Sequence, residues 1–123
     1  DGAREWSRSG PRPGYSGVNS RHPNRSPALP AYFIAEVEVL DPAPFQEYVQ
    51  GAPATVRQYG GEYVARGGAI EVLEGSWHPK RLTIIRFESV ARAKEWFNSP
   101  EYAPFKAIRK RTTKANLLVT EGL

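Results

Sequence analysis

Apolar and polar residues alternate over residues 32–39, with Phe33 and Val37 on one face. A period of two in a run of this length predicts a β-strand. Asp41 and Pro42 follow, and these residue types favour the N-cap and the first position of a helix. The pattern therefore indicates that a strand gives way to a helix at this point.

Apolar side chains then recur every three or four residues from Phe45 to Tyr59, a spacing that predicts a helix. Pro53 lies inside this pattern, so we expect a kink or a break near Gly51. The pair at residues 60–61, Gly-Gly, supplies the left-handed conformation in which helices commonly end. The first helix is therefore expected to end at these glycines.

Two short apolar segments come next, at residues 62–65 and 69–73. They predict a second strand together with its continuation or its partner. The Gly67-Gly68 pair between them is consistent with a hairpin turn or a β-bulge. After a loop, residues 82–87 form a third apolar segment and predict the next strand.

The last third of the chain predicts helical structure followed by a strand. Ser89 is a typical N-cap, and Trp96 lies on the inward face of the helix that follows it. Pro100 indicates that the helix restarts there, because proline favours the first helical position. Residues 115–120 predict the final strand.

The predicted order is β-α-β-β-α-β, the ferredoxin-like arrangement of an α+β domain. Its antiparallel sheet carries two helices on one face and leaves the other face to water, a partner or a ligand. Two such sheets packed face to face would enclose a barrel, so we expect a homodimer or a larger assembly. The predicted domain covers residues 31–123, and residues 1–30 precede it as a separate segment.

Residues 1–30 contain five Pro, four Gly and five Ser. Such a composition buries too little apolar surface to offset the entropy of ordering, so a flexible tail is predicted. The alternative is a segment that docks on a partner subunit. The tail carries five Arg against two acidic residues, whereas residues 31–123 carry 12 basic and 11 acidic side chains. A nearly neutral domain disfavours nucleic-acid binding, which usually uses a basic face.

The absence of cysteine excludes disulfides, thiolate catalysis and iron–sulfur centres. His22 and His78 are the only histidines, which leaves little material for a metal site or a catalytic triad. No apolar run is long enough to span a bilayer, and no secretory signal is visible. We therefore expect a cytoplasmic protein with no membrane contact, no metal and no organic cofactor.

Several segments carry a family resemblance. Residues 59–68 read YGGEYVARGG, residues 71–77 read EVLEGSW, residues 81–89 read RLTIIRFES and residues 99–102 read SPEY. With Ile108-Arg109, this ordered set resembles the DUF1330 family over residues 31–123. The resemblance implies the dimeric α+β barrel group, which includes small cofactor-independent monooxygenases and isomerases. It implies a fold and leaves the reaction open.

Three residues are candidates for catalysis. Arg66 ends a predicted strand and could bind a carboxylate or an enolate, although an ion pair with Glu74 is an alternative. Tyr102 lies in the matched SPEY segment and could donate a hydrogen bond to a bound oxygen. His78 could act as a general base near neutral pH, although an exposed histidine beside a proline is the simpler interpretation.

Further residues are candidates for substrate binding. Tyr48 could donate a hydrogen bond to a bound oxygen, as could Tyr63, and Trp77 could form a wall of a pocket, although each of these rings could simply be packed. Arg109 could bind an anion at the pocket mouth, or it could complement the dipole of the helix that it ends.

Two functions follow as hypotheses. The first is a cofactor-independent enzyme that binds an anionic or carbonyl substrate inside the barrel. The second is a non-catalytic ligand-binding or assembly module that uses residues 1–30 to dock on a partner.

Overall fold

The computed structural model describes residues 29–123. Its elements, in chain order, are β1 (Ala31–Val39), α1 (Pro42–Gln58), β2 (Glu62–Arg66), β3 (Leu82–Phe87), α2 (Val90–Phe97), α3 (Ala103–Thr112) and β4 (Thr113–Glu121). The predicted tail, and with it the docking segment, lies outside the described residues except for its last two positions. No helix in the described part of the chain is long and apolar enough to cross a bilayer.

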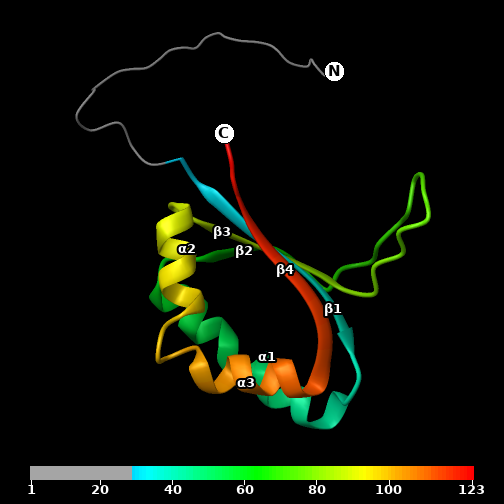
Figure 1. Ribbon diagram of the computed structural model, residues 1–123, viewed down its shortest axis with the longest axis horizontal. Helices are drawn as coiled ribbons and strands as arrows, with labels where there is room; N and C mark the ends of the chain where they lie inside the picture. Colours follow the sequence, from blue (N-terminus) through cyan, green and yellow to red (C-terminus); the bar gives the residue numbers. More distant parts are fainter. Residues whose placement is uncertain (1–28) are drawn as a thin grey trace, which may run out of the picture.

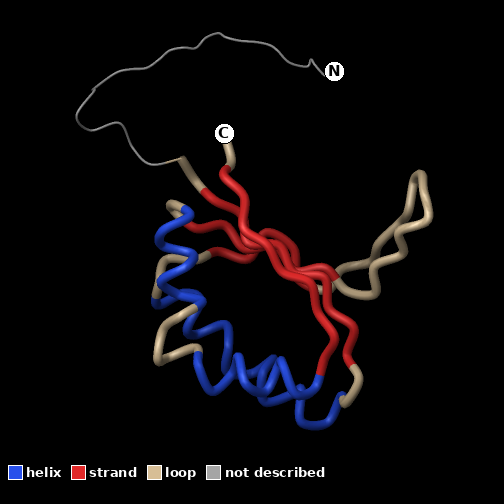
Figure 2. Tube along the Cα trace, viewed as in Figure 1, coloured by secondary structure: helices blue, strands red, loops and turns tan. Residues whose placement is uncertain are grey.

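The strands form one antiparallel sheet in the order β2-β3-β1-β4. All three helices lie on one side of this sheet, which leaves the opposite face open (Figures 1 and 2). We call these the covered face and the open face. The ferredoxin-like α+β fold is thereby confirmed. The second predicted helix is divided, because α2 and α3 are separated by a turn.

The turn between α2 and α3 is where the helical turn predicted at Pro100 restarts, although α3 itself begins at Ala103. Ser99 caps this turn. Its hydroxyl oxygen accepts a hydrogen bond from the Tyr102 backbone N–H at 3.1 Å, and its carbonyl accepts from the Ala103 N–H, also at 3.1 Å. This is the bonding pattern of an N-cap, so a helical turn starts after Ser99 and leads into α3.

The expected break near Gly51 is absent, since α1 runs without interruption to Gln58. Gly51 serves another purpose, because a Cβ atom there would overlap the ring of Phe105 in α3. The helix ends as predicted. Gly60 has a φ of +79°, and its N–H and that of Gly61 each donate to a carbonyl of the last turn at 2.9 Å. This is the Schellman arrangement of a helix end.

The second strand is shorter than predicted. Residues 69–73 form no strand and belong to an extended loop, residues 67–81, that projects from the domain (Figure 1). We call it the arm. Gly67 closes its base by donating its N–H to the Leu82 carbonyl at 2.9 Å. Leu73 in the arm is 93% exposed, and residues 69–73 pair with no strand within residues 29–123.

The core lies between the covered face and the helices, around Trp96 of α2. Its ring meets Phe33 of β1 edge-on at 5.1 Å and lies 4.2 Å from the Tyr102 ring, between centroids. The indole N–H donates to the Thr55 hydroxyl at 3.0 Å, so the polar atom of this buried ring is satisfied.

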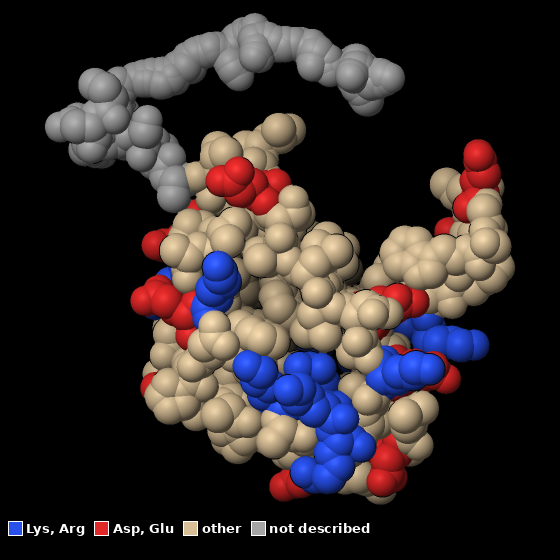
Figure 3. Space-filling view, viewed as in Figure 1, with Lys and Arg blue, Asp and Glu red and all other residues tan. Residues whose placement is uncertain are grey.

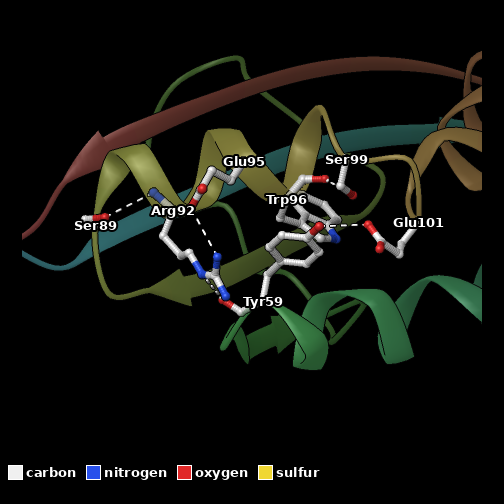
Figure 4. A network of polar contacts seen from close by, with 7 residues as sticks. All are labelled: Tyr59, Ser89, Arg92, Glu95, Trp96, Ser99 and Glu101. Carbon is white, nitrogen blue, oxygen red and sulfur yellow. Dashed lines mark hydrogen bonds and ion pairs between the residues drawn. The ribbon is translucent and has the colours of Figure 1, made fainter.

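Polar contacts join α2 to the end of α1 (Figure 4). Arg92 Nε donates to the Tyr59 carbonyl at 3.2 Å, and Ser89 caps α2 by accepting from the Arg92 N–H at 3.0 Å. The Tyr59 hydroxyl donates to Glu101 at 2.7 Å and thereby lowers the pKa of that carboxyl group. These contacts fix the helix layer above the sheet.

Candidate functional site

A cavity of about 30 Å³ lies between the covered face and α1. We call it the helix–sheet cavity. Its polar lining comes from all layers of the domain and consists of Tyr48, Tyr63, Arg66, Arg81, Thr83 and Arg109. The volume corresponds to about two water molecules, which suits a small ligand or the head group of a larger one.

Arg66 reaches this cavity because of a bulge in β2. Tyr63 pairs with Ile85 and Ala65 pairs with Ile84, so the register shifts by one residue between them. In a regular strand Tyr63 and Arg66 would point to opposite faces, because side chains alternate. The extra residue turns Arg66 to the covered face, where its guanidinium lies 4.9 Å from the centre of the Tyr63 ring.

Pro53 provides the anchor for Arg66. Proline has no N–H, so the Val49 carbonyl one turn earlier in α1 loses its helical donor. Arg66 Nη2 donates to this carbonyl at 3.0 Å. The proline that predicted a break in the helix therefore creates the acceptor that holds the guanidinium at the cavity.

Arg81 lies at the same edge of the cavity. A Cβ atom on Gly67 would come within 3.0 Å of its Nη1, so the missing side chain leaves room for this guanidinium. The φ of +67° at Gly67 also favours glycine. Arg81 further approaches the Phe45 ring, with its Cζ atom 5.8 Å from the ring centre.

Arg109 is the most deeply buried of the three arginines, with only 5% of its surface exposed. Its Nε donates to the Tyr102 hydroxyl at 3.4 Å, which is long for such a bond. The Tyr102 oxygen lies 2.8 Å from the Tyr48 oxygen. Within residues 29–123, neither Nη atom of Arg109 has a hydrogen-bond partner and no carboxylate pairs with it.

The cavity is electropositive. Its lining contains three arginines and no Asp or Glu, and no acidic residue of the described chain forms an ion pair with any of the three. Burial raises the pKa of the Tyr48 hydroxyl far above its ordinary value, and burial also raises that of Tyr63 against the opposing charge of Arg66. Both tyrosines are therefore neutral at physiological pH and do not balance the positive charge.

The structure brings together the predicted site residues Tyr48, Arg66 and Arg109 in the helix–sheet cavity. These three lie on the covered face, whereas the sequence predicted a ligand in a barrel on the open face. Tyr102 has no exposed surface, and its hydroxyl contacts two residues that line the cavity, Tyr48 and Arg109. The alternative ion pair of Arg66 with Glu74 is not formed.

Trp77 and His78 lie away from this cavity. Trp77 is 61% exposed, and its indole N–H donates to Glu36 on the open face at 2.9 Å. His78 is exposed and lines a separate hollow together with Glu36 and Lys80. The structure therefore separates both residues from the arginine cluster.

Sequence reasoning named Tyr63 only as a possible hydrogen-bond donor, and it missed Arg81 and Thr83 as cavity residues. Tyr63 lies in the same short segment as Arg66, but only the bulge places both on one face. Arg81 precedes β3 in what reads as an ordinary loop end. The available signal was Gly67, directly after Arg66 at the end of the strand. A glycine at such a position indicates that another side chain, here that of Arg81, packs closely against the backbone.

Exposed basic side chains gather elsewhere, over α3 and the adjoining part of β4 (Figure 3). The last turn of α3 contains Lys110 and Arg111 beside Arg109. Cations at this end stabilise a helix through its dipole. This surface therefore has a structural explanation. The dipole also favours the charge of Arg109, but it leaves the Nη groups of that buried side chain without an acceptor within residues 29–123.

Comparisons with known proteins agree on the fold. A family model described as a domain of unknown function (DUF1330) matches residues 30–123. Among curated proteins, none matches the chain. Among solved structures, the RPA0582 protein of unknown function from Rhodopseudomonas palustris is 19% identical with a TM-score of 0.65, over 77% of this chain and 83% of that one.

Two other solved structures are similar. SnoaB, a cofactor-independent oxygenase from Streptomyces nogalater, is 13% identical with a TM-score of 0.57, over 78% of this chain and 95% of that one. A hypothetical Arabidopsis thaliana protein is 13% identical with a TM-score of 0.59, over 82% of this chain and 96% of that one. At these identities the likeness establishes the fold alone.

Proposed function

Since the chain belongs to the DUF1330 family, whose function is unknown, we propose that it is a small-molecule enzyme that binds an anionic or carbonyl substrate in the helix–sheet cavity. This site lies at the covered face of the sheet, whereas the sequence predicted the substrate inside a barrel on the open face. It requires no cofactor for binding, because the arginines themselves provide the charge that recognises the substrate.

The observation that carries this proposal is the environment of Arg109. A guanidinium carries five N–H groups, and only Nε has an acceptor within the described chain. Burying a charge without a partner is costly, and native proteins normally pair it. A ligand carboxylate or enolate would satisfy the free N–H groups of Arg109 and would be shared with Arg66 and Arg81.

Such a site can promote reactions in which negative charge develops on a substrate oxygen. Fixed cations and hydrogen-bond donors that are already oriented stabilise that charge more strongly than water does. SnoaB, a similar fold described as a cofactor-independent oxygenase, supports the idea that chemistry without a cofactor is compatible with this architecture.

Arg66→Ala should weaken binding of a small carboxylate by roughly ten- to a hundredfold, the usual cost of a charge-assisted hydrogen bond. Propionate titrated into the full chain in a calorimeter at constant ionic strength measures this loss. Arg111→Ala is the matched control, because Arg111 is exposed on α3. Equal affinities of the wild-type protein and Arg66→Ala, or no saturable binding to either, would contradict the anion site.

The non-catalytic alternative is favoured by one feature, the apolar patch around Ile34 on the open face together with the exposed apolar side chains of the arm. Ile34 lies between Ile84 and Leu118 across the sheet, and Leu118 is 56% exposed. Trp77 and Leu73 of the arm add exposed apolar surface. A second copy of the chain would cover this surface, so a cytoplasmic homodimer is retained as a proposal alongside either function.

Leu118→Asp should convert the assembly into monomers, because a charge in the middle of an apolar interface is left unpaired and desolvated. Sedimentation velocity of the full chain at several concentrations measures the mass. Gln46→Asp, at an exposed position of α1 on the other side of the sheet, is the control for the added charge. A wild-type protein that sediments as a monomer would remove the homodimer.

A further inference from the structure

We propose that Arg109, Tyr102 and Tyr48 form a directed hydrogen-bond chain that presents the Tyr48 hydroxyl to the carbonyl oxygen of a small 2-oxo acid. The carboxylate of this substrate would be held by the cavity arginines, so the inference rests on the anion site proposed above. Tyr48 would then be the catalytic donor, and Tyr102 and Arg109 would be positioning residues for it.

The direction of the chain follows from donor and acceptor counting. Arginine can only donate, so the Tyr102 oxygen accepts from Arg109 Nε at 3.4 Å. Tyr102 has no exposed surface, and its only other hydroxyl partner in residues 29–123 is Tyr48, at 2.8 Å. If Tyr48 donated to Tyr102, the Tyr102 proton would be buried without an acceptor, which costs free energy.

The favoured direction therefore runs from Arg109 through Tyr102 to Tyr48. Tyr102 donates to the Tyr48 oxygen, and this leaves the Tyr48 proton free. Within the described chain the Tyr48 hydroxyl has no acceptor other than Tyr102, and its side chain lines the helix–sheet cavity. The free proton is thus available to a ligand oxygen, and the charge on Arg109 polarises both hydroxyl groups toward the cavity.

Tyr48 is suited to donate a hydrogen bond and not to act as a base. Burial, reinforced by Tyr102, raises the pKa of its hydroxyl well above the ordinary value, so the group keeps its proton. The ring is held by stacking on Phe45, with centroids 5.3 Å apart and the planes inclined by 14°. A neutral, fixed donor of this kind stabilises an oxygen on which negative charge develops.

The polarity of the cavity indicates the substrate class. It offers several cationic donors for a carboxylate and, among its hydroxyl groups, the Tyr48 proton that the chain of hydrogen bonds leaves free for a second oxygen. A 2-oxo acid of two or three carbons has both oxygen groups on adjacent atoms. Its carboxylate would face the arginines while its carbonyl oxygen faced Tyr48.

Pyruvate and propionate provide the test, because they differ in the carbonyl oxygen at the carbon next to the carboxylate. Calorimetric titration of the wild-type chain should give a dissociation constant for pyruvate roughly three- to tenfold below that for propionate, the effect of one hydrogen bond. Tyr48→Phe should abolish this preference and leave propionate affinity within about twofold of wild type. Tyr102→Phe should reduce the preference in the same direction.

Tyr59→Phe is the matched control, because its hydroxyl bonds Glu101 outside the cavity and its loss should leave the preference unchanged. Equal binding of pyruvate and propionate to the wild-type protein would overturn the donor chain while the anion site stands. If Tyr48→Phe removes the preference for pyruvate but Tyr102→Phe keeps it in full, the role of Tyr102 in the hydrogen-bond chain would be overturned. Failure of both acids to bind would overturn the anion site and the donor chain with it.

Discussion

Trp96→Ala is expected to lower the free energy of unfolding by about 3–5 kcal/mol, the usual cost of deleting a large aromatic side chain from a core. Trp96 is 1% exposed and contacts Phe33 of the sheet and Tyr102 before α3. Its loss would also leave the Thr55 hydroxyl without the indole donor. Because domains of this size are stable by only about 5–15 kcal/mol, the variant should be close to unfolded at 37 °C.

Urea denaturation at one fixed protein concentration measures this effect. Gln46→Ala is the control, since Gln46 is exposed on α1 and its removal should change the free energy of unfolding by less than about 1 kcal/mol. If Trp96→Ala proves too unstable to purify, Trp96→Phe keeps an aromatic ring and should show a smaller loss. A core variant no less stable than the Gln46 control would contradict the packing described here.

Arg109→Met is expected to have opposite effects on stability and on binding. The variant removes a buried charge that lacks a carboxylate partner and keeps an unbranched apolar side chain, so the unliganded protein should gain about 1–2 kcal/mol of stability. Propionate binding should fall by roughly ten- to a hundredfold, because the most deeply buried donor is lost. If Arg109 had only a structural role, its replacement would not both stabilise the unliganded protein and weaken propionate binding.

Urea denaturation with and without a saturating concentration of propionate measures both quantities. The ligand should stabilise the wild-type protein and have little effect on Arg109→Met, as linkage requires. Arg111→Met, two positions along α3 on an exposed site, should resemble the wild type in both respects. A variant that is markedly less stable than the wild type without ligand would assign Arg109 to structure and remove the basis of the anion site.

The pattern of apolar residues predicted most of the fold because each strand and helix has one buried face. The alternation in β1 and the helical spacing of α1 and α2 match the sides that face the core. The segment at residues 69–73 led to a wrong prediction because it has the composition of a strand but no partner strand within residues 29–123. Strand formation depends on that partner, which local sequence does not specify.

The candidate site was predicted less completely because its geometry depends on irregular features. Arg66 faces the cavity only through the β2 bulge, and it is held there by a carbonyl that Pro53 leaves free. Tyr48 was identified from its residue type, and Tyr102 also from the matched SPEY segment. The sequence did not predict that Tyr102 is fully buried while Tyr48 lines the cavity. His78 had suitable chemistry in the sequence, yet the arm places it away from the arginines.

The central claim is that the helix–sheet cavity binds a small anion through its arginines. The most direct measurement follows the arginine Nε–H signals of the full chain by two-dimensional ¹H–¹⁵N NMR during titration with propionate, with chloride at equal ionic strength as the control. Arg109→Met assigns the signal of Arg109 by its loss. The account predicts that the Arg109 and Arg66 signals shift saturably with propionate and respond weakly to chloride. Identical, non-saturating responses to both anions would contradict it.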